Sequence, residues 1–214
     1  ACRPIRLTVD SGMHSIAMDD DCRMFADTSS DLDRPTTVKI YEISSTGPVF
    51  IGMNGSSSFS DSLRLVLTLH DAIDDDHTLA NLGGASSSGS SQSDRLLTSL
   101  PPPELLSFPT SDGTETLHAA IYRPDPRVHG PGPYPLVCAV YGGPHVQRVN
   151  RSWSQSADMR AQRLRSLGFC VVKCDNRGSS RRGLAFESSI SRRLGRLEVL
   201  DQVAAVRQLT VRGI

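Results

Sequence analysis

The chain has 214 residues, of which 38% are hydrophobic and only 5% aromatic, so a core must be built mainly from aliphatic side chains. Basic and acidic residues balance at 23 each, whereas a dedicated nucleic-acid-binding protein would carry a basic excess. No apolar run approaches the roughly 18 to 20 residues that span a bilayer. The sequence opens at Ala1 without the charged and apolar regions of a signal peptide.

Residues 1–70 have the pattern of an antiparallel β structure. Short, partly alternating apolar runs are separated by turns rich in Asp, Gly, Ser and Pro. These runs are residues 4–8, 15–18, 23–27, 37–41 and 63–67. Their spacing of about ten residues is typical of a meander such as a propeller blade, whose faces need neighbouring blades to cover them. We therefore predict that residues 1–70 form the end of a β-propeller.

Residues 71–103 read as a linker. The acidic triplet Asp74–Asp76 is either a divalent-cation ligand set or a solvated loop, and the loop is the simpler interpretation. A low-complexity stretch rich in Ser and Gly follows at residues 83–93. Three prolines at 101–103 then stiffen the chain before the next ordered segment.

From Glu104 the pattern changes to α/β. Residues 104–108 and 117–122 form candidate hairpin strands around a turn at 111–113, and residues 169–175 a candidate buried strand. Pro135–Tyr141 is a continuous apolar run, which predicts a strand buried on both faces. Apolar residues at helical spacing follow the candidate strands 135–141 and 169–175. One helix carries Ala157, Ala161, Leu164 and Leu167 and is closed by Gly168, and another starts near Leu197 with a stripe of Val199, Val203 and Val206.

This alternation of strands and helices predicts a mostly parallel sheet, in which function collects at the carboxyl ends of the strands. One such end carries Tyr141, followed by Gly142, Gly143 and Pro144. Its phenol either donates to an oxyanion during acyl transfer or caps the strand structurally above a tight turn. The neighbouring His145 is either a base or a surface histidine.

The other strand end carries Asp175–Gly178, in which Arg177 either pairs with an aspartate or binds an anion. Twelve basic residues against three acids between Gln147 and Arg196 keep open an anion-binding protein that uses Arg177, Arg181 and Arg182. The glycine pairs fit neither a phosphate-binding loop nor a dinucleotide fingerprint. We expect no cofactor.

The five cysteines form no C-x-x-C pair, and the spacing around them does not suggest a metal site. Cys138 lies inside an apolar run and is predicted to behave as a small buried hydrophobe. Cys170 and Cys174 are predicted to face the same side of a strand. An odd number of cysteines in core-like positions favours a reducing compartment.

Four blocks in order carry a family resemblance, namely Tyr134–Pro144, Arg165–Phe169, Asp175–Ser179 and Arg193–Gln202. They resemble the prolyl oligopeptidase family of serine peptidases, most of all its dipeptidyl peptidase IV, 8 and 9 branch and the plant and algal members. The resemblance covers residues 104–214. It implies an α/β-hydrolase fold, of which this chain holds the first part of the sheet, preceded by the last propeller blade or blades.

The resemblance further implies a serine peptidase that removes N-terminal dipeptides, preferably after proline, from peptide substrates. Tyr141 matches the family tyrosine whose hydroxyl stabilises the oxyanion. We expect no metal, no nucleic-acid partner and no membrane contact in this segment. A homodimer of the full-length protein and a cytoplasmic location are the family-based expectations.

The sequence departs from the family at the catalytic centre. The 214 residues hold no G-x-S-x-G motif, and because this fold orders its triad Ser, acid, His, all three residues are expected beyond Ile214. The substrate-gripping glutamates and arginine of the propeller are expected before Ala1. The chain is thus expected to be an internal fragment that is inactive alone. The alternative is a truncated product that serves as a binding or dimerisation module.

Overall fold

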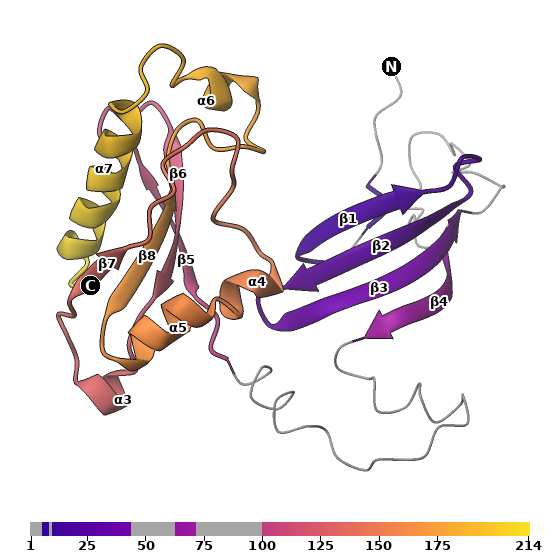
Figure 1. The fold of residues 1–214 in the computed structure, drawn as a ribbon, viewed down its shortest axis with the longest axis horizontal. Helices are drawn as coiled ribbons and strands as arrows, with labels where there is room; N and C mark the ends of the chain where they lie inside the picture. Colours follow the sequence, from indigo (N-terminus) through magenta and orange to yellow (C-terminus); the bar gives the residue numbers. More distant parts are fainter. Residues whose placement is uncertain (1–5, 9, 44–62, 72–99) are drawn as a thin grey trace, which may run out of the picture. The chain divides into compact units, whose positions relative to one another are not determined.

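The computed structural model describes residues 6–8, 10–43, 63–71 and 100–214. The chain divides into two compact units, one of residues 1–99 with 151–153, and one of residues 100–150 with 154–214. Each unit contains a four-stranded sheet, shown in Figure 1. The predicted acidic triplet and the Ser/Gly stretch lie outside the described residues.

The first unit is an antiparallel meander with strand order β1-β2-β3-β4. Its strands are β1 (Met13–Met18), β2 (Met24–Asp31), β3 (Arg34–Ile43) and β4 (Leu63–Asp71). Four of the five predicted runs are therefore confirmed as strands. The first run is wrong over residues 6–8, which are irregular and pair with no described strand; there the Arg6 side chain donates to the Asp10 carbonyl over 3.1 Å.

The second unit has strand order β5-β6-β8-β7. β5 (Glu104–Pro109) and β6 (Thr116–Tyr122) form the predicted antiparallel hairpin, β6 pairs antiparallel with β8 (Cys170–Asp175), and β8 pairs parallel with β7 (Leu136–Cys138). The expected parallel pair is present. Among the described strands, however, the sheet is mixed rather than mostly parallel, because the hairpin contributes two antiparallel pairings.

The two parallel strands differ in burial. All six residues of β8 are buried, as predicted. β7 is only three residues long, with Leu136 and Val137 half-buried and Cys138 exposed. The prediction of a longer strand buried on both faces, with Cys138 in the core, is therefore wrong. The physical reason for the exposure of β7 is that it is the edge strand of the described sheet, with one side open.

Helices cover both faces of the second sheet (Figure 1). On one face, α7 (Leu197–Val211) packs Ala204, Ala205 and Leu209 against Cys170, Val172 and Cys174, which confirms that the two cysteines face one side. On the other face, α5 (Met159–Ser166) packs Ala161 and Leu164 against Val171 and Tyr122. Asp158 caps α5 by accepting the backbone N–H groups of Arg160 and Ala161.

Three short helices complete the second unit, α3 (Pro126–His129), α4 (Trp153–Ser156, which begins in the segment grouped with the first unit) and α6 (Leu184–Ser188). The predicted helical spacing from Ala157 is confirmed from Met159 onward, with Gly168 closing the turn at a φ of 90°. Within the described ranges, no helix combines the length and apolarity needed to cross a bilayer.

Candidate functional site

The carboxyl ends of β7 and β8 meet in two connected loops. The His145 backbone N–H donates to the Gly178 carbonyl over 3.1 Å, which joins the loop after β7 to the loop after β8. The Asp175 carboxylate accepts the backbone N–H groups of Arg148 and Val149 over 2.7 and 3.1 Å. Hydrogen bonds to the main chain therefore order this region, which lies at the carboxyl ends of the strands, where α/β proteins place their sites.

Tyr141 is presented to solvent by the first of these loops. Its side chain follows β7 and is 54% exposed. The phenol oxygen makes no hydrogen bond with the residues that the structure describes. A phenol in this position retains its full capacity to donate to a group that arrives from outside.

The two glycines after Tyr141 set the position of its ring. Gly142 has a φ of 76°, a left-handed conformation that favours glycine. A Cβ on Gly143 would lie 2.9 Å from Cε1 of the Tyr141 ring. The ring therefore lies directly over the Gly143 backbone, in space that any other residue would fill.

Asp175 is structural in this arrangement. Burial raises the pKa of its carboxyl group, although the two backbone N–H groups act in the opposite direction. With both oxygens bound to the main chain of residues 148 and 149, Asp175 fixes the end of β8 to that segment. It is not the partner of Arg177.

Arg177 is the centre of a buried ion-pair network. Its guanidinium donates to both oxygens of the fully buried Asp201 on α7, over 3.1 and 2.8 Å, and to Asp112 in the β5–β6 turn over 2.8 Å. These hydrogen bonds raise the pKa of Arg177 above its ordinary value. The interpretation as a structural Asp–Arg pair is thus confirmed, but the aspartates come from α7 and from the hairpin turn rather than from Asp175.

The remaining predicted positions do not form a common site. His145 is exposed, with Nδ1 3.6 Å from the Glu187 carboxylate. Arg182 donates to the Thr116 carbonyl over 2.7 Å and lies over the Phe186 ring, while the Arg181 backbone N–H donates to Glu187. Arg177, Arg181 and Arg182 therefore have separate contacts. Across the described ranges, no group of three or more His, Cys, Asp or Glu side chains is placed to hold a metal ion.

A buried lysine is the feature that sequence reasoning missed. Lys173 in β8 is 4% exposed, and its Nζ lies 2.7 Å from Asp158 and 3.0 Å from the Tyr122 hydroxyl. Burial alone would raise the pKa of Asp158, but the Lys173 ammonium and the N–H groups at the start of α5 outweigh it, and the pKa is lowered. The sequence feature that could have revealed this pair is a single cation inside an apolar strand that follows a helix starting with an aspartate.

Ser107, His118 and Asp175 lie side by side on three adjacent strands but do not form a triad. Ser107 and His118 share a hydrogen bond of 2.8 Å, made through Nδ1 of the imidazole. Asp175 lies opposite His118 in the register, but its oxygens are bound to backbone N–H groups. Because the carboxylate does not orient the imidazole, this row lacks the arrangement of a nucleophile, base and orienting acid.

What the site can do chemically therefore depends on Tyr141. It is an exposed hydrogen-bond donor on a loop shaped by two glycines, beside a second loop anchored by buried charges. Such a donor suits a reaction that develops negative charge on an oxygen. Comparison with known proteins bears on which reaction that is.

Residues 153–214 match the prolyl oligopeptidase family. The chain is 41% identical over 111 residues to dipeptidyl peptidase 8 from Homo sapiens, a match that covers 52% of this chain and 12% of that protein. It is 39% identical over 77 residues to a probable dipeptidyl peptidase 4 from Neosartorya fischeri, covering 35% of this chain and 10% of the fungal protein. The chain thus matches about a tenth of the length of these relatives. The comparisons confirm its resemblance to the prolyl oligopeptidase family, and within that family to the dipeptidyl peptidases.

Proposed function

We propose that this chain supplies the oxyanion-stabilising part of a serine dipeptidyl peptidase. The observation that carries the proposal is the exposed Tyr141 phenol, which has no hydrogen-bond partner among the described residues and whose ring is seated over Gly143. The relatives named dipeptidyl peptidase support the reaction class. The substrates would be peptides that lose an N-terminal dipeptide, preferably after proline.

In this reaction, a serine hydroxyl attacks the scissile carbonyl carbon and the carbonyl oxygen becomes an oxyanion. Tyr141 would donate its phenolic hydrogen to that oxygen, and it would do so more strongly in the transition state than in the ground state. The serine, the acid and the histidine would be contributed by other residues of the intact protein. No cofactor or metal enters this scheme.

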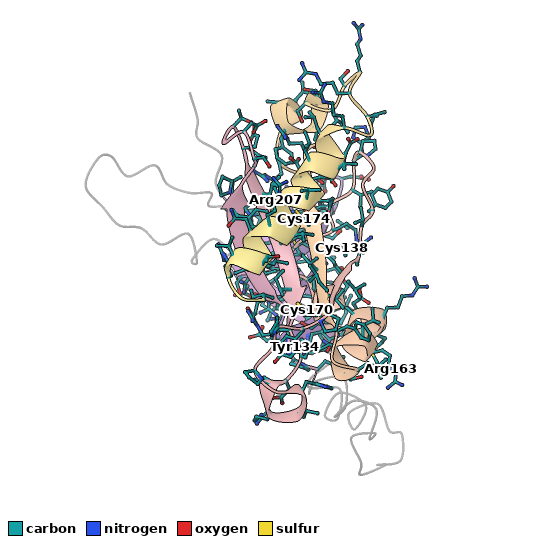
Figure 2. All side chains as sticks on the ribbon, turned by 90° about the vertical axis from the view of Figure 1, so that its left-hand side faces the viewer. Tyr134, Cys138, Arg163, Cys170, Cys174 and Arg207 are labelled. Atoms are coloured by element: carbon teal, nitrogen blue, oxygen red, sulfur yellow. The ribbon has the colours of Figure 1, made fainter. Side chains whose placement is uncertain are left out.

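The test is the Tyr141→Phe variant of the intact protein, assayed on a chromogenic Xaa-Pro substrate. We expect kcat to fall by about 10²–10³-fold, because only the hydroxyl is lost. A fluorophosphonate probe should still label the serine. The matched control is Tyr134→Phe, since Tyr134 lies before β7, at the end of the strand away from the Tyr141 loop (Figure 2), where its hydroxyl donates to the Gly130 carbonyl. An unchanged kcat for Tyr141→Phe would leave Tyr141 with a structural role only.

For the first unit we propose the end of a β-propeller. A single meander of four antiparallel strands in sequential order is the composition of one propeller blade. Apolar side chains on it are exposed, as a blade between neighbours requires, and they include Ile16, Met18, Leu65, Leu67 and Leu69. On the same family basis we propose a cytoplasmic location and a homodimer for the full-length protein.

The second candidate function is a non-catalytic binding or dimerisation module. The observation that favours it is the amount of apolar surface exposed on both units, on β4 and on α7. The fluorophosphonate probe separates the two candidates, because a binding module would show no activated serine in the native protein.

A further inference from the structure

Lys173 in β8 is a buried cation that takes no part in the reaction proposed above. Its Nζ atom donates to the Asp158 carboxylate over 2.7 Å, to the Tyr122 hydroxyl over 3.0 Å and to the side-chain oxygen of Gln155 over 3.3 Å. A buried ion pair adds little net stability, because the cost of removing the charges from water offsets their attraction. An apolar side chain is often as stable in such a position, so stability alone does not explain a lysine here.

The ammonium of Lys173 fixes the orientation of the Gln155 side-chain amide. Gln155 is only 6% exposed, and its amide lies between the ammonium and the backbone carbonyl of Arg148. An ammonium group only donates hydrogen bonds, and a carbonyl only accepts them. The amide therefore turns its oxygen to Lys173 and its nitrogen to Arg148, to which Nε2 donates over 2.8 Å. The reversed amide would place two donors against each other at one end and two acceptors at the other.

The carbonyl that Gln155 holds belongs to the far end of the Tyr141 loop, which runs from the end of β7 to Arg148. The N–H group of Arg148 donates to Asp175 in β8 over 2.7 Å, and its carbonyl accepts from Gln155. Lys173 and Asp175 lie two residues apart in β8. One strand thus fixes both backbone groups of Arg148, directly through Asp175 and indirectly through Gln155. The end of the loop is set relative to the fully buried strand of the sheet.

Tyr141 depends on the path of this loop for its own position. Its side chain is exposed, and its hydroxyl makes no hydrogen bond with the residues that the structure describes. Oxyanion donors act at about 2.7–3.1 Å from the oxygen that they stabilise. A displacement of about 1 Å caused by a change far from the chemistry can lower a rate by about 10²-fold. The backbone of the loop therefore decides whether the hydroxyl reaches the oxyanion.

From these contacts we propose that Lys173 and Gln155 are positioning residues for Tyr141. The buried ammonium orients the Gln155 amide, and the amide holds the end of the loop so that the phenol faces the reacting carbonyl. Both residues are buried, so neither touches the substrate. The inference rests on the proposed function, in which the Tyr141 hydroxyl stabilises the oxyanion.

Two substitutions of Gln155 in the intact protein, assayed on the Xaa-Pro substrate, test the proposal. Gln155→Met keeps the length of the side chain but removes both hydrogen bonds of the amide. Gln155→Glu keeps an acceptor for the Lys173 ammonium but replaces the donor to Arg148 with a second oxygen. We expect both to lower kcat by about tenfold or more, with KM little changed because the lost contact acts in the transition state. A normal kcat for Gln155→Glu would overturn the inference, since this variant loses only the hold on the loop.

The role of the lysine is tested by removing its charge together with that of its partner. The double variant Lys173→Met with Asp158→Asn leaves no buried charge unpaired, and an asparagine still caps the start of α5. The amide is then free to take either orientation, so kcat should fall. Asp158→Asn alone is the control, because the ammonium still orients Gln155, and it should keep kcat. Equal kcat values for the double variant and this control would refute the role of the lysine.

The matched control for Gln155 is Gln162→Met on α5. Gln162 is 8% exposed, and its amide nitrogen donates to the backbone carbonyls of Pro101 and Ser156, outside the loop. Its loss should lower the melting temperature about as much as the loss of Gln155 while leaving kcat unchanged. Equal kcat values for Gln155→Met and Gln162→Met would show that Gln155 is only one more buried amide, and would overturn the inference.

Combination with Tyr141→Phe identifies the route by which Gln155 acts. If it acts through the hydroxyl, Gln155→Met should lower kcat in the native background but not further when the hydroxyl is already absent. Losses that multiply in the double variant would refute the inference alone. An unchanged kcat for Tyr141→Phe by itself would instead refute the proposed function, and the inference with it. Where Gln155→Met does not fold, Gln155→Glu completes the same comparison.

Discussion

Arg177 shows why arginine rather than lysine occupies the loop after β8. Its planar group binds both oxygens of Asp201 and still reaches Asp112, a set of contacts that a lysine ammonium cannot make at once. Through them, α7, the end of β8 and the β5–β6 turn are held together. Asp201 is fully buried, whereas the Asp112 side chain is 47% exposed.

The first prediction concerns this network. Asp201→Asn keeps the shape of the side chain but removes the buried partner of the guanidinium, which then keeps only the half-exposed Asp112, and should lower the free energy of unfolding by about 3–5 kcal/mol. Asp112→Asn should cost no more than about 1 kcal/mol because solvent screens the exposed pair. Urea unfolding of the intact protein measures both. Equal losses for the two variants would contradict this division.

The second prediction concerns the buried thiols. Burial raises the pKa of Cys170 to about 11 and that of Cys174 to about 12, against about 8.5 for an exposed thiol. The folded state therefore holds these protons more tightly than the unfolded state. The resulting stability is complete below pH 8.5 and declines as the pH rises from there towards 11 and 12, because the unfolded chain loses its thiol protons first.

Unfolding midpoints in urea between pH 7 and pH 10.5 measure this decline. Cys174→Ala should make the alkaline decline shallower, since one of the two groups is removed. Cys22→Ala, at an exposed position in the first unit, should leave the slope as it is. An identical slope for all three proteins would show that the buried thiols do not contribute.

Among the elements, the Tyr141 loop is one whose shape depends on glycines, because a Cβ at Gly143 has no free space beside the Tyr141 ring. Gly143→Ala would place a methyl group 2.9 Å from the Tyr141 ring, so we expect the ring to move and kcat to fall while the melting temperature changes little. Gly130→Ala is the control, because it introduces a left-handed alanine at a φ of 79° with no neighbour within 4 Å. A normal kcat for Gly143→Ala would mean that the ring position is not critical.

The elements also show what the sequence can predict. β8 and the hairpin were predicted from their apolar pattern. The prediction is correct because the elements that cover them lie within the described chain, as the core clusters show. β7 has the same apolar pattern but is short and partly exposed. Local pattern reports that a segment is suited to burial, while actual burial depends on what stands beside it.

The same distinction applies to the site. Tyr141 was identified by its position after a strand and before two glycines, together with the family resemblance. The partners of Arg177 were not, because Asp112 and Asp201 lie 65 and 24 residues away along the chain. Ion pairs between residues far apart in the chain produce no recognisable spacing pattern in a sequence. The Lys173–Asp158 pair, which joins β8 to α5, produces none either.

At the scale of the whole molecule, both units expose apolar surface that a stable globular protein would cover. In the first unit, Leu65, Leu67 and Leu69 are 50%, 49% and 59% exposed along β4, at the edge of the sheet. In the described part of the second unit, Val199 and Val203 of α7 are 56% and 39% exposed, and β7 ends the sheet. Exposed strand edges and apolar patches of this kind promote association.

We therefore predict that the 214 residues expressed alone fold poorly, bind a dye specific for exposed apolar surface and aggregate, whereas the intact protein does none of these. The physical reason is that the leucines of β4, the outward side of α7 and the β7 edge of the second sheet are left uncovered in the described structure, so the apolar contacts formed do not offset the conformational entropy lost. Dye fluorescence, thermal unfolding and amide hydrogen exchange measure the difference. A cooperative transition with strong amide protection over residues 135–175 in the isolated chain would contradict the prediction, and would show that β7 and β8 with their helices suffice for a stable unit.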